Sequence, residues 1–156
     1  MAHVTPATLV DASMEGDVSA IGDLLAAGAD IGTTDEEGWM PLMAAAATGH
    51  VEAAQLLIAA GADVNEQDQD GWPALCYAVD NHRGSVVAEL ISKGASCSLT
   101  TADGWTALHM ACVEGDAEVF GLVFGAVLAT AKQTLNWITP EVRRHAHCLL
   151  RARYPP

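Results

Sequence analysis

The amino-acid sequence predicts an all-α repeat solenoid, and three observations lead to this fold class. The first is a period of 33 residues, shown by Gly38, Gly71 and Gly104, each of which is followed by a tryptophan. The second is the abundance of alanine, in runs such as Ala44–Ala47, which favours short, tightly packed helices over strands. The third is an acidic turn signal before each of these glycines. Together they predict stacked helix–turn–helix units.

The same period governs the positions expected in the core. Leucine, alanine and glycine recur at matching places, which indicates one repeated pattern of buried residues. A single unit cannot bury both of its helices, so neighbouring units must stack to form a continuous core. The recurring sets are Leu9, Leu42, Leu75 and Leu108; Ala12, Ala45, Ala78 and Ala111; Leu24, Leu57, Leu90 and Val123; and Gly28, Gly61 and Gly94.

Each unit is expected to contain a turn, a short helix and a longer helix, in that order. In the second unit Gly38 permits the positive φ of the turn, and Pro41 suits the first turn of the short helix. Gly49 then interrupts the chain, and Gly61 occupies the cap position that ends the longer helix. That helix carries apolar residues at helical spacing, namely Val51, Ala54, Leu57 and Ile58.

All 156 residues are predicted to form one domain, since the length suits a single core. Thr5 and Pro6 open the first unit, whose early helix is expected to carry Asp11, Glu15 and Asp17. The expected boundaries are 1–34 for a first, N-terminal capping unit, 35–67, 68–100 and 101–131 for the second, third and fourth units, and 132–156 for a C-terminal capping helix.

The last segment has the features of a capping helix. Thr139 can cap a helix that begins at Pro140. Alternatively, this basic helix contacts a second partner or the acidic body of another copy of the chain. Its apolar stripe is Val142, Ala146, Leu149 and Leu150, and Arg143, Arg144, Arg151 and Arg153 lie outside the stripe.

Several segments resemble the ankyrin repeat. In the second unit these are residues 35–42, 49–52 and 56–65, which include Gly-Trp-Met-Pro-Leu, Gly-His-Val-Glu and Gly-Ala-Asp-Val-Asn. The Thr-Pro-Leu-His element of the family is kept at Thr106–His109 as Thr-Ala-Leu-His. The resemblance covers roughly residues 5–131. It implies an ankyrin-repeat stack of helix–turn–helix units with short β-hairpin or turn fingers.

The third unit departs from the family pattern. His82, Arg83 and Gly84 stand where Gly-His and an apolar residue are usual, and residues 95–98 replace Ala-Asp-Val-Asn with Ala-Ser-Cys-Ser. We therefore expect lower local stability in this unit, with the fold unchanged.

Charge is distributed unevenly along the chain, whose formal net charge is −13. Residues 1–131 contain 19 acidic residues and two basic ones, Arg83 and Lys93, whereas residues 132–156 contain five basic residues and one acidic one. Such an acidic body repels nucleic acids and anionic membranes and attracts a basic protein segment. A solvated surface that maintains solubility is the alternative interpretation.

In ankyrin repeats, the residue after the turn glycine lies where a finger meets the first helix and faces the concave groove. The resemblance therefore implies that Trp39, Trp72 and Trp105 line such a groove. Indole faces beside carboxylates favour lysine and arginine side chains. Packing of each indole on the next finger is the alternative interpretation. The accompanying site residues are Glu36, Glu37, Asp70 and Asp103 on the fingers, with Asp80, Asn81 and Glu114 at the ends of the first helices.

These features predict a non-enzymatic adaptor, scaffold or escort that binds a basic peptide or helix of a partner protein. We expect a monomer with no cofactor and with no nucleic-acid, membrane or small-molecule ligand. Self-assembly from the basic end of one copy to the acidic groove of another is one alternative, and a histone-tail-type reader is another. No combination of nucleophile, base and oxyanion donors that would indicate an enzyme is visible in the sequence.

The four cysteines show no close spacing, so we expect reduced, mostly buried thiols and a cytoplasmic or nuclear location. The N-terminal residues lack the pattern of a signal peptide. Residues 66–71 resemble the start of a calcium loop, but Tyr77 occupies the twelfth position, which requires a bidentate glutamate. Residues 145–148 read His-Ala-His-Cys, but neighbouring helical residues diverge, so no metal site is expected.

Asn65 matches the pattern that an asparagine hydroxylase prefers in ankyrin repeats, together with Leu57, Asp63 and Val64. Support of the finger turn is the alternative role of this residue.

Overall fold

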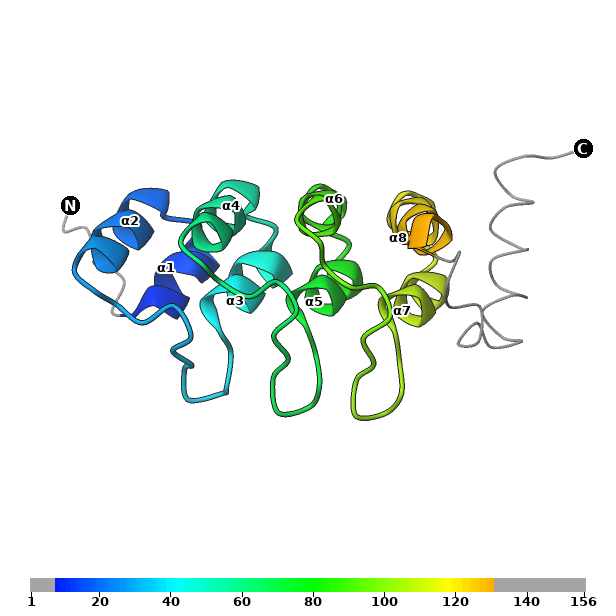
Figure 1. Cartoon of the computed structure of the whole chain (residues 1–156), viewed down its shortest axis with the longest axis horizontal. Coiled ribbons are helices and arrows are strands. Elements are labelled where there is room, and N and C mark those ends of the chain that lie inside the picture. The colour runs from blue at the N-terminus through cyan, green and yellow to red at the C-terminus, as the bar shows by residue number, and fades with distance from the viewer. Residues whose placement is uncertain (1–7, 131–156) are drawn as a thin grey trace, which may run out of the picture.

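Four pairs of helices stack side by side in the computed structural model, which describes residues 8–130 (Figure 1). The predicted capping helix, Thr5, Pro6, Cys148 and the 145–148 segment lie outside the described residues. The pairs are α1 (Leu9–Glu15) with α2 (Val18–Ala26), α3 (Pro41–Thr48) with α4 (Val51–Ala59), α5 (Ala74–Asp80) with α6 (Gly84–Ser92), and α7 (Ala107–Glu114) with α8 (Ala117–Thr130).

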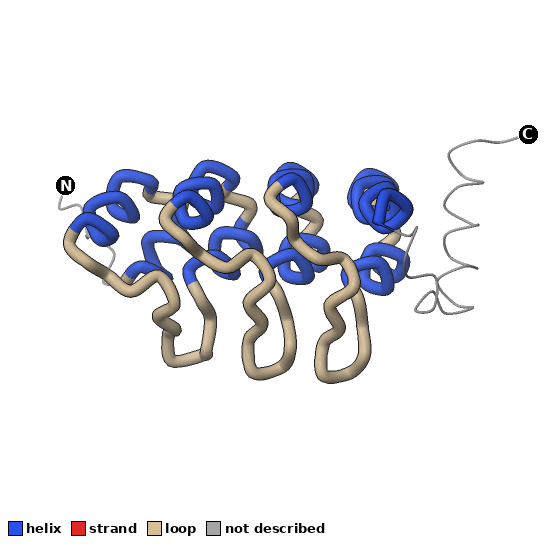
Figure 2. Tube along the Cα trace, in the orientation of Figure 1, coloured by secondary structure: helices blue, strands red, loops and turns tan. Residues whose placement is uncertain are grey.

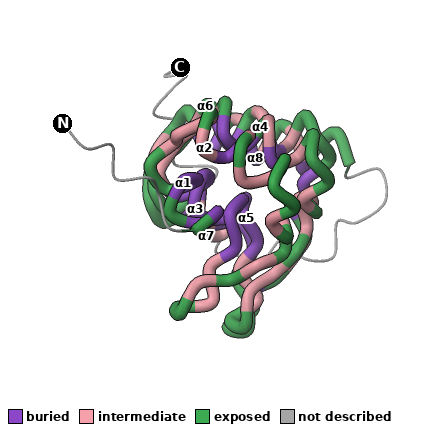
Figure 3. The backbone as a smooth tube through the Cα atoms, turned by 90° about the vertical axis from the view of Figure 1, so that its left-hand side faces the viewer, coloured by how far each residue is buried: buried purple, intermediate pink, exposed green. Residues whose placement is uncertain are grey.

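The helices form two layers. The first helices α1, α3, α5 and α7 pack on one another in order, and the second helices α2, α4, α6 and α8 do the same. Buried residues concentrate where the layers meet, as the view along the stack shows (Figure 3). The recurring alanines are all buried, and the leucines at positions 9, 42, 57, 75, 90 and 108 are buried with them, which confirms most of the predicted core. Leu24 is only partly buried.

The fingers are turns. Long loops between successive pairs hang from the same side of the stack (Figure 2). The described residues contain no strand, and their one isolated antiparallel bridge joins Gln67 to Pro73. Of the two predicted forms, β-hairpin or turn, the fingers therefore adopt the turn. Each finger is closed within five residues by backbone hydrogen bonds, such as the one from Gly71 N–H to Asp68 O at 3.0 Å.

The helix ends follow the predicted signals. Helix α3 begins at Pro41, and Gly49 ends it in the left-handed conformation, with φ of 93°. The first unit differs from the prediction in one residue. Thr8 accepts a hydrogen bond from Asp11 N and so caps α1, whereas Asp17 accepts one from Ala20 N and caps α2. Asp17 therefore belongs to the second helix of the unit and not to the first, because a short acidic side chain at this position satisfies the free N–H groups of α2.

Helix α8 is longer than the other second helices because its stop signal is missing. In the first three units the glycine at position 28, 61 or 94 adopts a positive φ just after the helix ends. Val127 occupies this place in the fourth unit and is buried in the core. A β-branched residue adopts positive φ only at high cost, so the helix continues to Thr130.

The third unit keeps the fold through contacts that replace the family pattern. His82 adopts φ of 56° where the other units have glycine. Arg83 donates from Nε to the carbonyl oxygen of Ala47, 3.0 Å away, and so satisfies an acceptor at the end of α3. Asn65 joins the loop after α4 to the loop after α6, since its Oδ1 accepts from Ser96 N at 2.7 Å.

Replacing His82 with glycine is expected to raise the free energy of unfolding by about 1 kcal/mol, because glycine adopts this backbone without a Cβ clash. The imidazole lies 3.4 Å from Glu114 and 3.6 Å from Asp116, but such exposed pairs contribute little. Urea denaturation at neutral pH measures the change. His82→Ala keeps the Cβ and loses both pairs, so a glycine variant no more stable than the alanine variant would contradict the prediction.

Candidate functional site

The three tryptophans occupy equivalent positions at the base of the fingers. In each finger the first residue holds the tryptophan backbone, because its side chain accepts from the tryptophan N–H and its own N–H donates to the tryptophan carbonyl. This pair of hydrogen bonds fixes the tryptophan backbone at the equivalent position in each of the three units. The accepting distances are 2.8 Å for Asp35 and Trp39, 2.7 Å for Asp68 and Trp72, and 3.2 Å for Thr101 and Trp105.

Tyr77 of α5 lies between two of these tryptophans. Its ring centroid is 4.7 Å from that of Trp39 and 5.2 Å from that of Trp72, with tilted planes in both cases. The indole centroids are therefore at most about 10 Å apart. We call Trp39, Tyr77 and Trp72 the aromatic cluster. Tyr77 is not among the site residues predicted from the sequence; it breaks the repeat, because the neighbouring units have Ala44 and Met110 at this position.

Asp68 holds the aromatic cluster in place. Its Oδ1 accepts from Trp72 N and from Asp70 N, and its Oδ2 accepts from the Tyr77 hydroxyl at 2.6 Å. Both carboxylate oxygens therefore face the protein. The pKa of Tyr77 is raised well above its usual range, mainly by burial, then by this hydrogen bond and by the nearby acidic charges.

Replacing Tyr77 with phenylalanine is expected to lower the free energy of unfolding by about 1 kcal/mol at neutral pH, because the hydrogen bond to Asp68 is lost. Since the folded state raises the pKa of Tyr77, this contribution is present below the unfolded pKa of about 10 and is lost as the pH rises above it. The stability difference between the two proteins should therefore begin to shrink at about pH 10 and continue to shrink as the pH rises toward the raised pKa of folded Tyr77, as measured by urea denaturation. A difference that stays constant would contradict this assignment.

Trp105 has a different environment from the other two tryptophans. Its side chain is 42% exposed, and its ring lies 6.3 Å from that of His109. No aromatic residue takes the place of Tyr77 in this unit, because Met110 occupies the position. His109 also completes a capping box, since Thr106 N donates to Nδ1 at 3.1 Å and His109 N donates to the Thr106 hydroxyl. Because Nδ1 accepts this hydrogen bond, the proton of the neutral imidazole is on Nε2.

The predicted polar site residues are all exposed, but they differ in their contacts. Asn81 donates to the carbonyl oxygen of Tyr77 at 2.9 Å, and Glu114 lies near His82. The two basic residues of the described range are engaged elsewhere, since Arg83 bonds to Ala47 and Lys93 pairs with Glu89 at 3.7 Å. Within residues 8–130, no ion pair neutralises the four finger carboxylates Glu36, Glu37, Asp70 and Asp103.

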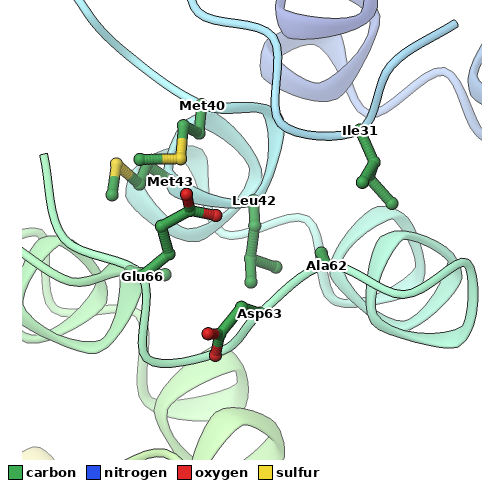
Figure 4. Close-up of a pocket in the computed structure, with 8 residues that line it drawn as sticks. Ile31, Met40, Leu42, Met43, Ala62, Asp63 and Glu66 are labelled. Carbon is green, nitrogen blue, oxygen red and sulfur yellow. The ribbon is translucent and has the colours of Figure 1, made fainter.

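Two pockets of very different size lie in the described part of the chain. The one in Figure 4 lies beside α3 and has a volume of about 10 Å³, room for about one water molecule. A second pocket of about 450 Å³, between residues 94–98 and the end of α8, has no charged side chain in its lining. The first is lined by Ile31, Met40, Leu42, Met43, Ala62, Asp63, Glu66 and Ala74.

The described thiols are free and buried, as expected for Cys76, Cys97 and Cys112. Burial raises the pKa of Cys76 to about 12 and that of Cys112 to about 11, and it also raises the pKa of Cys97. These thiols are therefore protonated and poorly nucleophilic at neutral pH. Over residues 8–130, no group of three or more His, Cys, Asp or Glu side chains is placed to hold a metal ion.

The described helices are all too short or too polar to cross a membrane. A comparison with curated protein sequences found no match. The family described as ankyrin repeats (3 copies) matches residues 9–101 and 60–126, and its members generally act in protein–protein interaction. The match spans more than half of the chain and agrees with the stack of helix pairs and fingers. The chain therefore belongs to the ankyrin-repeat family.

Proposed function

We propose that this protein is a non-enzymatic adaptor, scaffold or escort that binds a basic segment of a partner protein. The proposed binding surface, which we call the tryptophan face, combines the three tryptophans with the exposed polar residues around them. Two observations support it most: a tryptophan is held at the equivalent position of three fingers, and the exposed carboxylates of those fingers have no basic partner among residues 8–130. The polar members are Glu36, Glu37, Asp70, Asp103, Asp80, Asn81 and Glu114.

The chemistry of the tryptophan face favours lysine and arginine. An indole attracts a cation with about 0.5–1 kcal/mol at exposed sites, and adjacent carboxylates add Coulomb attraction. An extended ligand rises about 3.3 Å per residue, so every third side chain would match indoles up to about 10 Å apart. A helical ligand would instead use side chains two turns apart.

Calorimetric titration tests this function. A synthetic peptide of alternating lysine and glycine is expected to bind the full chain, whereas the same peptide with glutamate in place of lysine should not bind. Raising the salt concentration from about 50 mM to about 500 mM should weaken the binding at least tenfold, because salt screens exposed charges. The variant with alanine at all three tryptophans should not bind the lysine peptide. Equal binding of both peptides would reject the proposed function.

A modification of Asn65 is proposed as a separate property. Its amide joins two loops, since Nδ2 donates to Gly94 O at 3.4 Å while Oδ1 accepts from Ser96 N. This geometry supports the structural role of the residue and leaves hydroxylation as a hypothesis. Exposure of the chain to asparagine hydroxylase, followed by mass spectrometry, should show a gain of one oxygen at Asn65. An unmodified residue would dispose of the hypothesis.

A further inference from the structure

The fourth unit carries a stripe of accessible side chains, at Trp105 and on α7, that the second and third units do not present. His109 and Val113 lie one turn apart on α7, and Trp105, which precedes the N-cap Thr106, places its ring 6.3 Å from that of His109. Trp105 is 42% exposed, Val113 is 59% exposed, and His109 between them is half-buried against the Trp105 ring. We call these three residues the α7 stripe.

In α3 the equivalent stripe is closed. Met43 and Ala47, which follow Trp39 at the same spacing, are both buried. Tyr77 covers one side of the Trp39 ring. Little apolar surface is therefore left on α3 for a ligand side chain.

In α5 the equivalent stripe is broken by burial and charge. Cys76 is buried and Asp80 is an exposed carboxylate, so Trp72 has no apolar neighbour that a ligand could reach along the helix. Trp72 itself packs against the core as well as against Tyr77. Among the three units that contain a finger tryptophan, the fourth unit therefore has the most exposed apolar surface.

We propose that the α7 stripe is the energetic centre of the tryptophan face and binds an amphipathic basic helix of a partner protein. This inference rests on the proposed function. His109 and Val113 lie one turn apart on α7 and the Trp105 ring lies beside that of His109. An amphipathic ligand helix likewise presents its apolar side chains turn by turn along one face. Apolar ligand residues on this face would cover Trp105 and Val113. Basic residues beside them would face the exposed carboxylates of Asp103 and Glu114.

The aromatic cluster then has a different role from Trp105. Tyr77 and Asp68 hold Trp39 and Trp72 in fixed positions, so these two indoles support the fingers and contribute flat surface. Binding hot spots are large side chains that become fully buried only when the partner binds. Trp105 meets that description better than the two clustered indoles because it has more surface left to bury.

The test uses the full chain and two synthetic 18-residue peptides of leucine and lysine with identical composition. One peptide places the leucines on a single helical face, and the other scrambles their order. Fluorescence anisotropy of labelled peptides should show at least about tenfold tighter binding of the amphipathic peptide. Trp105→Ala should weaken that binding about 30-fold and Val113→Ser about fivefold.

A matched variant elsewhere separates this effect from a general loss of apolar surface. Leu128 is also exposed, 54%, but lies on α8, in the layer of second helices. Leu128→Ser should leave the affinity within about twofold of the parent. The thermal unfolding midpoint of Trp105→Ala and Val113→Ser should match that of the parent chain.

The possible outcomes distinguish the two proposals. If the parent chain binds neither peptide, the proposed function fails. If it binds both peptides equally, or if Trp105→Ala binds like the parent, only the assignment to the α7 stripe fails. A lower unfolding midpoint in Val113→Ser would show that the stripe is covered within the chain. Light scattering that detects a dimer in the parent but a monomer in Val113→Ser would assign the stripe to a second copy. Either result overturns the inference.

Discussion

Reversing one carboxylate on each finger is expected to weaken binding of a basic peptide by at least about 100-fold. The variant replaces Glu37, Asp70 and Asp103 with lysine. These side chains are exposed and form no ion pair within the described range, so they are available to a cationic ligand. Each replacement removes an attraction and adds a repulsion at short range, and like charges facing each other across an interface are strongly unfavourable. Calorimetry with the lysine–glycine peptide measures the loss.

A control variant with the same change in net charge tests whether position matters. Asp23, Glu52 and Glu118 are exposed on α2, α4 and α8, away from the fingers, and are also replaced with lysine. Because screening limits the effect of distant charges to about 8–10 Å at ordinary salt, this variant should lose less than about tenfold in affinity. Equal losses in both variants would mean that overall charge, and not the tryptophan face, controls binding.

Replacing Leu75 with alanine is expected to lower the free energy of unfolding by roughly 3 kcal/mol, the largest stability effect of any change considered. Leu75 is 1% exposed and lies on α5, which packs between α3 and α7. Removal of its side chain leaves a cavity that neighbouring units cannot fill without losing their own contacts. Since small domains are stable by only about 5–15 kcal/mol, the midpoint in urea should fall markedly.

Leu128→Ala provides the matched control, because it makes the same chemical change at a residue that is 54% exposed. Its cost should stay within about 0.5 kcal/mol. Urea denaturation followed by circular dichroism measures both variants under one condition. If the two variants were equally stable, the assignment of Leu75 to the core of the stack would be wrong.

Stability and binding are expected to separate along the stack. The first three units supply much of the buried leucine and alanine core, and the aromatic cluster ties the second unit to the third. The fourth unit carries Trp105 and Val113, which contribute little to burial. In a repeat protein each unit contacts only its neighbours, so a binding surface in one unit can change with limited effect on the rest.

The departures in the third unit show why an altered motif does not remove the fold. Arg83 contributes a hydrogen bond to the carbonyl oxygen of Ala47 in α3, and Asn65 joins the altered loop through Ser96 N. His82 retains the left-handed turn at an energetic cost. We therefore expect the lower local stability of the third unit to come mainly from His82. The His82→Gly variant tests this expectation.

The sequence by itself determined the features that repeat. The period established the order of helices and fingers, Pro41 and Gly49 marked the ends of α3, and the recurrence of tryptophan marked one position in every finger. These signals are local or strictly periodic, so they can be recognised in the sequence without knowing what each side chain contacts.

Only the tertiary structure decided how the three tryptophans differ. Tyr77 fills the space between Trp39 and Trp72, whereas Trp105 stays exposed beside the accessible Val113. A 33-residue period treats the units as equivalent, but Tyr77 stands at a position that does not repeat, and it contacts Trp39 of the preceding unit as well as Trp72 of its own unit. Which side chains meet across units follows from the stacking of helices far apart in the chain, and that contact sets both their burial and their availability to a partner.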